Sequence, residues 1–138
     1  MAHKPKILMI DDDPDLVAST QVVLEKSGYE VATALRGVEG LVKARADTPD
    51  LIILDVIMPE MDGFEVCEEL KSDPTLAHVP VMMLTGFSDK VAETSISVSR
   101  GFSLEAEDYV DKPVRPRELL RRVQKLLPKR PKKTLASP

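Results

Sequence analysis

The chain has 138 residues, of which 43% are apolar and 30% are charged, proportions that suit one globular domain with its own core. No apolar run is long enough to cross a membrane, and the N-terminal residues MAHKPKILMI lack a signal-peptide pattern, so we expect a cytoplasmic protein with no membrane association. A single Cys excludes an internal disulfide framework and a cysteine-based metal cluster.

The net charge of −4 is distributed unevenly along the chain. From Lys112 onward there are ten Lys and Arg residues and one acid, a net +9, whereas the preceding 111 residues carry 22 acids and nine bases, a net −13. An acidic body with a basic end does not match a nucleic-acid-binding protein built around one broad basic face. We expect a domain over residues 1–128, followed by a basic, disordered tail over residues 129–138 that does not bind nucleic acid.

The first third of the chain predicts two strands separated by a helix. The apolar run Lys6–Ile10 predicts the first strand, and a helix follows with Pro14 as its first residue and Asp13 as its cap. Gly28 provides a C-terminal stop for this helix. Residues 29–34 predict a second strand that is less buried, because polar residues interrupt its apolar pattern.

The middle of the chain predicts a second helix and a third strand. Leu51–Leu54 is a continuous apolar run, typical of a strand buried on both faces in a parallel sheet, and it stops abruptly at Asp55. Pro59 and the pair Asp62-Gly63 then predict a turn. The helix before this strand is predicted from four apolar residues at helical spacing: Val38, Leu41, Val42 and Ala44.

The next segment predicts a third helix, a fourth strand and a fourth helix. Phe64, Cys67 and Leu70 have the spacing of one helical face, and Val79–Leu84 is an apolar run that stops at Thr85. Ser88–Arg100 supports a helix less well, because it is rich in Ser, Thr and β-branched residues.

The last part of the chain predicts a fifth strand and a final helix. Asp108–Asp111 is a short strand that ends at Lys112, and the helix begins near Pro116. Five strands that alternate with five helices predict a flavodoxin-like, doubly wound α/β fold, with helices on both faces of a parallel sheet. The expected strand order is 2-1-3-4-5.

This order brings five polar residues to the carboxyl edge of the sheet: Asp11, Asp12, Asp55, Thr85 and Lys112. Crowded carboxylates shift their pKa values or recruit a cation, and hard oxygen ligands with open water positions suit Mg²⁺. Lys112 can balance the acids and Thr85 can donate a hydrogen bond, while Asp55 at the centre is the candidate nucleophile for an acyl phosphate.

Four segments, ILMIDDDPDL, LIILDVIMPEMDGFE, VPVMMLTG and DYVDKP, resemble the successive landmarks of a bacterial two-component response regulator receiver domain. The resemblance covers residues 5–127 and implies the same strand order, so the two expectations are not independent. It implies that Asp55 is the phosphoacceptor, that Asp12 binds Mg²⁺ directly and that Asp11 acts more through water. It also implies that the backbone carbonyl of Ile57 is the third protein ligand of the ion.

The resemblance further assigns the residues that respond to the phosphoryl group. Thr85 matches the switch hydroxyl, Tyr109 the aromatic residue that turns inward with it, and Lys112 the lysine that contacts the phosphate. Pro113 matches a proline that is usually preceded by a cis peptide bond. The implied partner is a sensor histidine kinase or a histidine phosphotransfer protein, and the implied catalysis is limited to self-phosphorylation and self-dephosphorylation.

One segment departs from the family pattern. Phe102 to Glu105 reads as an insertion between the fourth helix and the fifth strand, and we expect it to be locally disordered. Many receivers signal through this face, so a homodimer of this chain would use a different face. The chain is expected to be either a single-domain regulator or a receiver from a longer protein.

Two other functions fit parts of this residue pattern. A haloacid-dehalogenase-type phosphohydrolase also uses Asp, Mg²⁺, Thr or Ser, and Lys, but Asp11-Asp12-Asp13-Pro14-Asp15 lacks the Thr or Val of its motif and would leave Asp55 without a role. A receiver whose phosphorylation is vestigial is disfavoured because the set of acids and the lysine are complete.

Overall fold

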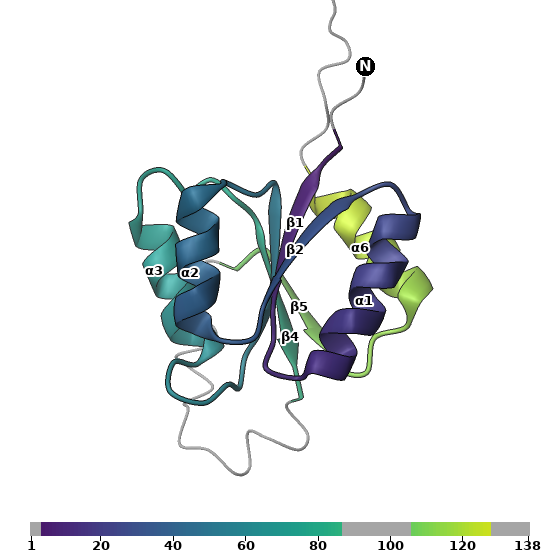
Figure 1. The fold of residues 1–138 in the computed structure, drawn as a ribbon, viewed down its shortest axis with the longest axis horizontal. Helices are drawn as coiled ribbons and strands as arrows, with labels where there is room; N and C mark the ends of the chain where they lie inside the picture. Colours follow the sequence, from purple (N-terminus) through teal and green to yellow (C-terminus); the bar gives the residue numbers. More distant parts are fainter. Residues whose placement is uncertain (1–3, 87–105, 128–138) are drawn as a thin grey trace, which may run out of the picture.

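A computed structural model describes residues 4–86 and 106–127, and these form a three-layer α/β fold around one parallel sheet (Figure 1). The strand order is β2-β1-β3-β4-β5, as predicted. The strands are β1 (Lys6–Ile10), β2 (Glu30–Ala34), β3 (Leu51–Asp55), β4 (Val81–Thr85) and β5 (Asp108–Asp111).

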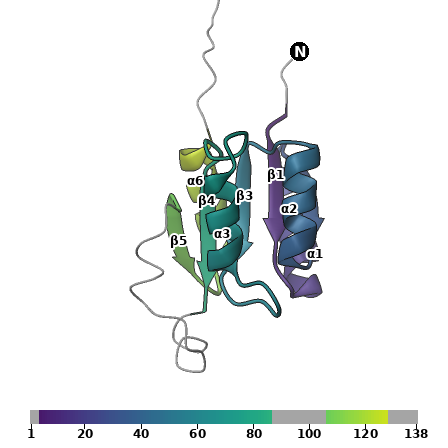
Figure 2. The same cartoon turned by 90° about the vertical axis from the view of Figure 1, so that its left-hand side faces the viewer.

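Helices cover both faces of the sheet (Figures 1 and 2). α1 (Pro14–Lys26) and α6 (Pro116–Leu126) lie on one face, and α2 (Gly37–Ala46) and α3 (Gly63–Ser72) lie on the other. Three expectations fall outside the described residues: the fourth helix over Ser88–Arg100, the disordered insertion Phe102 to Glu105, and the tail over residues 129–138. In the part of the chain that is described, no helix is both long and apolar enough to span a membrane.

The second and fourth strands begin slightly later than the sequence predicts. The backbone N–H of Tyr29 donates to the carbonyl of Leu24, which keeps Tyr29 in the turn that follows α1. The N–H of Val79 likewise donates to Leu76 O, and Pro80 has no N–H to give to a strand ladder. Both strands therefore begin later, because the preceding backbone N–H groups are used in a turn or, at Pro80, are absent.

The two ends of α1 confirm the cap and the stop that the sequence predicts, and α3 has a cap that we did not predict from the sequence. Asp13 caps α1 by accepting hydrogen bonds from the backbone N–H groups of Asp15 and Leu16. Gly28 follows this helix with φ +96°, a conformation that favours glycine. Asp62 and Glu65 form a reciprocal capping box at the start of α3, so the loop that leaves β3 enters this helix in a fixed direction.

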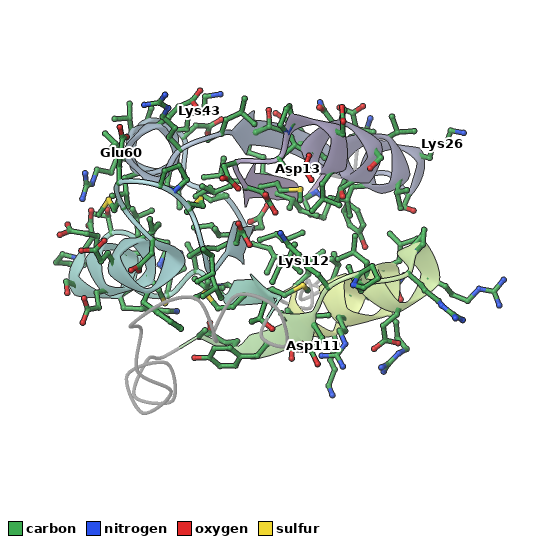
Figure 3. The ribbon with its side chains drawn as sticks, turned by 90° about the horizontal axis from the view of Figure 1, so that it is seen from below. Asp13, Lys26, Lys43, Glu60, Asp111 and Lys112 are labelled. Atoms are coloured by element: carbon green, nitrogen blue, oxygen red, sulfur yellow. The ribbon has the colours of Figure 1, made fainter. Side chains whose placement is uncertain are left out.

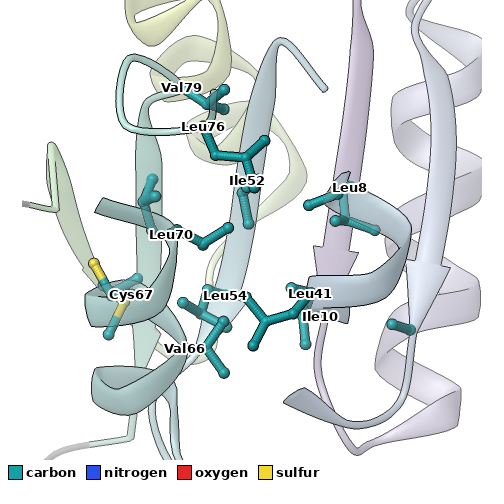
Figure 4. Packing of buried hydrophobic residues seen from close by; sticks show 14 of the residues in the cluster. Leu8, Ile10, Leu41, Ile52, Leu54, Val66, Cys67, Leu70, Leu76 and Val79 are labelled. Carbon is teal, nitrogen blue, oxygen red and sulfur yellow. The ribbon is translucent and has the colours of Figure 1, made fainter. Parts of the chain in front are cut away.

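The core lies on both faces of β3, whose five residues are all buried. Figure 4 shows the side that faces α2 and α3, where Leu8, Ile10, Ile52 and Leu54 meet residues of those helices. The other side joins β1, β3 and β4 to α1 and α6. Burial on both faces of the sheet explains why the sequence of β3 is an uninterrupted apolar run up to Asp55.

The α2 helix buries only part of the face that its apolar spacing indicates: Leu41 and Ala44 lie in the core, as predicted. Val38 and Val42 are about 60% exposed (61% and 59%), whereas Gly37 and Gly40 are buried. A Cβ atom at Gly40 would lie 2.4 Å from Cδ1 of Ile10. The helix approaches the sheet closely at its glycines, so two of the four residues used to predict it point to solvent.

The α6 helix carries a network of charged side chains. Glu118 accepts hydrogen bonds from the guanidinium groups of Arg121 and Arg122, which lower the pKa of its carboxyl to about 2. Arg122 also binds both carboxylate oxygens of Asp108 on β5, at 2.8 and 3.0 Å. This second contact connects α6 to the sheet.

Candidate functional site

The carboxyl edge of the sheet collects the polar residues that the sequence places at strand ends. Asp11 follows β1, Asp55 is the last residue of β3, Thr85 ends β4 and Lys112 follows β5. Figure 3, which views the molecule from below, shows Lys112 near the middle of this edge. Ion pairs join Lys112 to two of the acids, and Asp12 lies with those acids in one cluster.

Lys112 bridges two buried carboxylates. Its Nζ lies 3.1 Å from Oδ2 of Asp11 and 3.0 Å from Oδ1 of Asp55, whose residues are 0% and 1% exposed. Burial by itself lowers the pKa of Lys112, but the hydrogen bond and the charge of Asp55, together with Asp11, outweigh it and raise the pKa above 10.5. The lysine is therefore a fixed positive charge at the centre of the site.

The acids of the site form a group that could hold a cation. Asp11, Asp12 and Asp55 each offer a carboxylate oxygen, and the three oxygens lie within 4.8 Å of one another. The ligand oxygens around Mg²⁺ are separated by about 3–4 Å, because the ion binds them octahedrally at about 2.1 Å. The donor set is thus of the right chemistry and nearly the right size for Mg²⁺, with Asp12 on the solvent side.

The two oxygens of Asp11 already have protein neighbours. Oδ1 accepts a hydrogen bond from the N–H of Asp13 at 3.0 Å, and Oδ2 faces Lys112. Asp12 is exposed in comparison. This difference favours Asp12 over Asp11 as the acid whose carboxylate could coordinate an ion directly.

A tight loop after β3 holds the backbone next to Asp55. The N–H of Gly63 donates to the carbonyl of Val56 at 2.7 Å, and a Cβ atom at Gly63 would lie 2.2 Å from the carbonyl oxygen of Asp55. Only glycine allows α3 to begin this close to the end of β3. Ile57, the expected carbonyl ligand, lies in this loop, and Glu60 adopts φ +72° there with its carboxylate against Arg36.

The hydroxyl of Thr85 is engaged on the β5 side of the site. Thr85 Oγ1 donates a hydrogen bond to Oδ1 of Asp111 at 2.9 Å. Sequence reasoning missed Asp111, although the predicted order β4-β5 already pairs the ends of these strands. Tyr109, the expected aromatic partner of the switch, is half-buried on the same strand, and burial raises its pKa.

The peptide bond between Lys112 and Pro113 is cis, as the family resemblance implies.

Comparisons with known proteins show the family to which this fold belongs. The family model for the response regulator receiver domain matches residues 7–124. The chain belongs to this family.

Two curated relatives are transcriptional regulators. The DNA-binding dual master transcriptional regulator RpaA of Synechocystis sp. is 41% identical over 126 residues, which cover 89% of this chain and 49% of that protein. The alkaline phosphatase synthesis transcriptional regulatory protein PhoP of Bacillus subtilis is 42% identical over 122 residues, covering 88% of this chain and 48% of that protein. The chain thus spans about half the length of these curated relatives.

One solved structure superposes over its whole length on most of this chain. The chemotaxis response regulator CheY4 of Vibrio cholerae superposes with a TM-score of 0.80 at 32% identity, covering 91% of this chain and 100% of that one. The flavodoxin-like fold predicted from the sequence is therefore confirmed by the sheet order and by this neighbour. Membership of the receiver family also favours this reading over the phosphohydrolase alternative.

Proposed function

We propose that this receiver is the phosphoacceptor of a histidine–aspartate phosphorelay and that Asp55 takes the phosphoryl group. The observation that carries the proposal is the contact of Lys112 with Asp55 and Asp11, two buried carboxylates in the acidic cluster at the carboxyl edge of the sheet. An enclosed carboxylate beside a fixed cation and a cation-binding acid pair is the arrangement that phosphoryl transfer to an Asp requires.

The chemical step is a transfer of the phosphoryl group between two side chains. A carboxylate oxygen of Asp55 attacks phosphorus, the bond between phosphorus and the donor's imidazole nitrogen breaks, and the nitrogen keeps the electron pair. Lys112 stays protonated and faces the negative charge that gathers on the phosphoryl oxygens. The Thr85 hydroxyl is proposed to donate to one of these oxygens once it leaves Asp111.

A magnesium ion is part of this proposal. Asp12 and Asp55 with the carbonyl of Ile57 would bind it directly, and Asp11 would act through water, in keeping with the neighbours that both its oxygens already have. When bound, the ion supplies positive charge that neutralises the acids and the incoming phosphoryl oxygens.

The proposed phosphoryl donor is a sensor histidine kinase or a histidine phosphotransfer protein. A groove of about 460 Å³ beside the site supports docking there, because Leu16 and Thr20 of α1 line it together with Lys112 and Pro113. Val17, which follows Leu16 on α1, is buried in the core and does not line the groove. The partner's histidine would reach Asp55 from this side.

We propose a receiver over residues 1–128 with a basic tail over residues 129–138, and catalysis confined to the protein's own phosphorylation and dephosphorylation. We also propose that the protein is cytoplasmic, as the sequence leads us to expect. Turnover of a generic phosphatase substrate by the purified protein would contradict the limit on catalysis.

Labelling by a small phosphoryl donor tests the acceptor. Incubation with acetyl phosphate and Mg²⁺ should add the mass of one phosphoryl group to the wild type, and Asp55→Asn should abolish it. Asp50→Asn is the matched control, because Asp50 directly precedes β3 at the opposite edge of the sheet. Labelling that persists in Asp55→Asn would overturn the assignment.

A further inference from the structure

The Thr85 hydroxyl has a protein acceptor that the family resemblance does not provide. Thr85 is 2% exposed, and its Oγ1 donates to Oδ1 of the exposed Asp111 at 2.9 Å. The two residues are register partners in the parallel pair of β4 and β5. The hydrogen bond has good geometry and fixes where the hydroxyl points.

The position of Asp111 places it on the opposite side of β4 from Asp55. In the sheet, β4 lies between β3, which ends at Asp55, and β5, which ends at Asp111. Figure 3 shows Asp111 farther from the centre of the edge than Lys112. A hydroxyl has one proton to donate, so Thr85 can serve either Asp111 or a phosphoryl oxygen on Asp55, but not both.

We infer that Asp111 is a positioning residue that holds the hydroxyl of Thr85 away from Asp55 in the unphosphorylated protein. This inference rests on the proposed function, in which Thr85 turns to the phosphoryl group. Breaking the bond to Asp111 is then part of the free energy that phosphorylation must supply, so Asp111 sets how strongly the phosphoryl group shifts the protein to its switched state.

A separate backbone hydrogen bond links Thr85 and Lys112, the two residues that meet the phosphoryl group in the proposed function. The backbone N–H of Lys112, which directly follows Asp111, donates to the carbonyl of Thr85 at 2.6 Å. Loss of the side-chain bond leaves this backbone bond in place, because it does not involve the carboxylate of Asp111. A variant at Asp111 can therefore free the hydroxyl without removing the strand pairing that places Lys112.

Binding of beryllofluoride with Mg²⁺, a mimic of the phosphoryl group, tests the inference by titration calorimetry. Asp111→Ala should bind the mimic about 2- to 10-fold more tightly than the wild type, the range that corresponds to one hydrogen bond. Asp111→Asn is the matched control: its amide keeps an acceptor oxygen and the side-chain volume, so the affinity should stay within about twofold of the wild type.

A double-mutant cycle and an NMR measurement separate positioning from a structural effect. In a Thr85→Ala background, Asp111→Ala should no longer change the affinity, because no hydroxyl remains to be released. In the unbound protein, the three-bond couplings of Thr85 should report one χ1 rotamer for the wild type and rotamer averaging for Asp111→Ala.

Each failure has its own signature. Unchanged affinity and an unchanged Thr85 rotamer in Asp111→Ala, with beryllofluoride still bound by the wild type, would overturn the role of Asp111 alone. An equal gain in affinity with and without the Thr85 hydroxyl would do the same. If the wild type binds no beryllofluoride and takes no phosphoryl group from acetyl phosphate, the proposed function fails and the inference fails with it.

Discussion

Replacing Lys112 by Met should destabilise the fold in the absence of metal, because it leaves two buried carboxylates without their cation. Met keeps most of the apolar stem and removes only the charge. At an effective dielectric constant of about 20, each contact of Nζ at 3.0 or 3.1 Å is worth about 5 kcal/mol of attraction. Repulsion between Asp11 and Asp55, at up to 4.8 Å, is worth about 3.5 kcal/mol and is no longer offset by the lysine in the variant.

The measured effect will be smaller than these attractions, because burying the lysine also costs desolvation free energy. Removal of one partner from a buried ion pair destabilises proteins by about 3–5 kcal/mol. The side chain of Lys112 is 21% exposed, so we expect the lower end, about 3 kcal/mol. That is a large part of the stability of a typical domain.

The assay is urea unfolding followed by far-UV circular dichroism, since the chain has no Trp, at neutral pH with a chelator. Lys125→Met on the exposed side of α6 is the control and should change the free energy of unfolding by less than about 0.5 kcal/mol. Adding Asp55→Asn to Lys112→Met, or adding Mg²⁺, should recover part of the loss. If Lys112→Met lowers the free energy of unfolding by less than about 1 kcal/mol, Lys112 does not stabilise the two buried carboxylates as argued.

Three further predictions concern the rest of the fold. Gly40→Ala should lower the free energy of unfolding by about 1–3 kcal/mol, because its Cβ would meet Ile10 Cδ1 at 2.4 Å. Ile10→Val lacks that atom, so it should relieve part of the cost in the double variant. Additive losses of the two substitutions in urea unfolding would contradict this. Glu60→Gly should raise the melting temperature, because glycine adopts φ +72° without strain, and a lower melting temperature would show that the contact of Glu60 with Arg36 outweighs the strain. The pKa of Glu118 is lowered from 4.5 to about 2, so this residue stabilises the fold above pH 4.5 and loses this contribution as the pH falls to 2. The free energy of unfolding of Glu118→Gln should therefore fall less steeply than that of the wild type over this range. Parallel curves in acid titrations of the two proteins would rule the ion pair out as a source of stability.

Most of the architecture and the acidic cluster could be predicted from the sequence. The cap at Asp13, the turn at Gly28 and the buried run that ends at Asp55 are local signals, since each depends on residues adjacent in the chain. General rules for parallel sheets together with the resemblance to receiver domains then predicted the strand order, which places Asp55 beside Asp11.

Other features depend on how separate elements approach one another, and only the tertiary structure decided them. Apolar spacing predicted α2 and the burial of Leu41, but a close approach to Ile10 places Gly40 at the contact and leaves Val42 in solvent. The hydrogen bond of Thr85 to Asp111 is of the same kind: strand order pairs the two positions, but which acceptor the hydroxyl uses depends on side-chain rotamers and on what else lies within reach. Local sequence thus determined which groups stand at the carboxyl edge of the sheet, and packing across the sheet determined which of them touch.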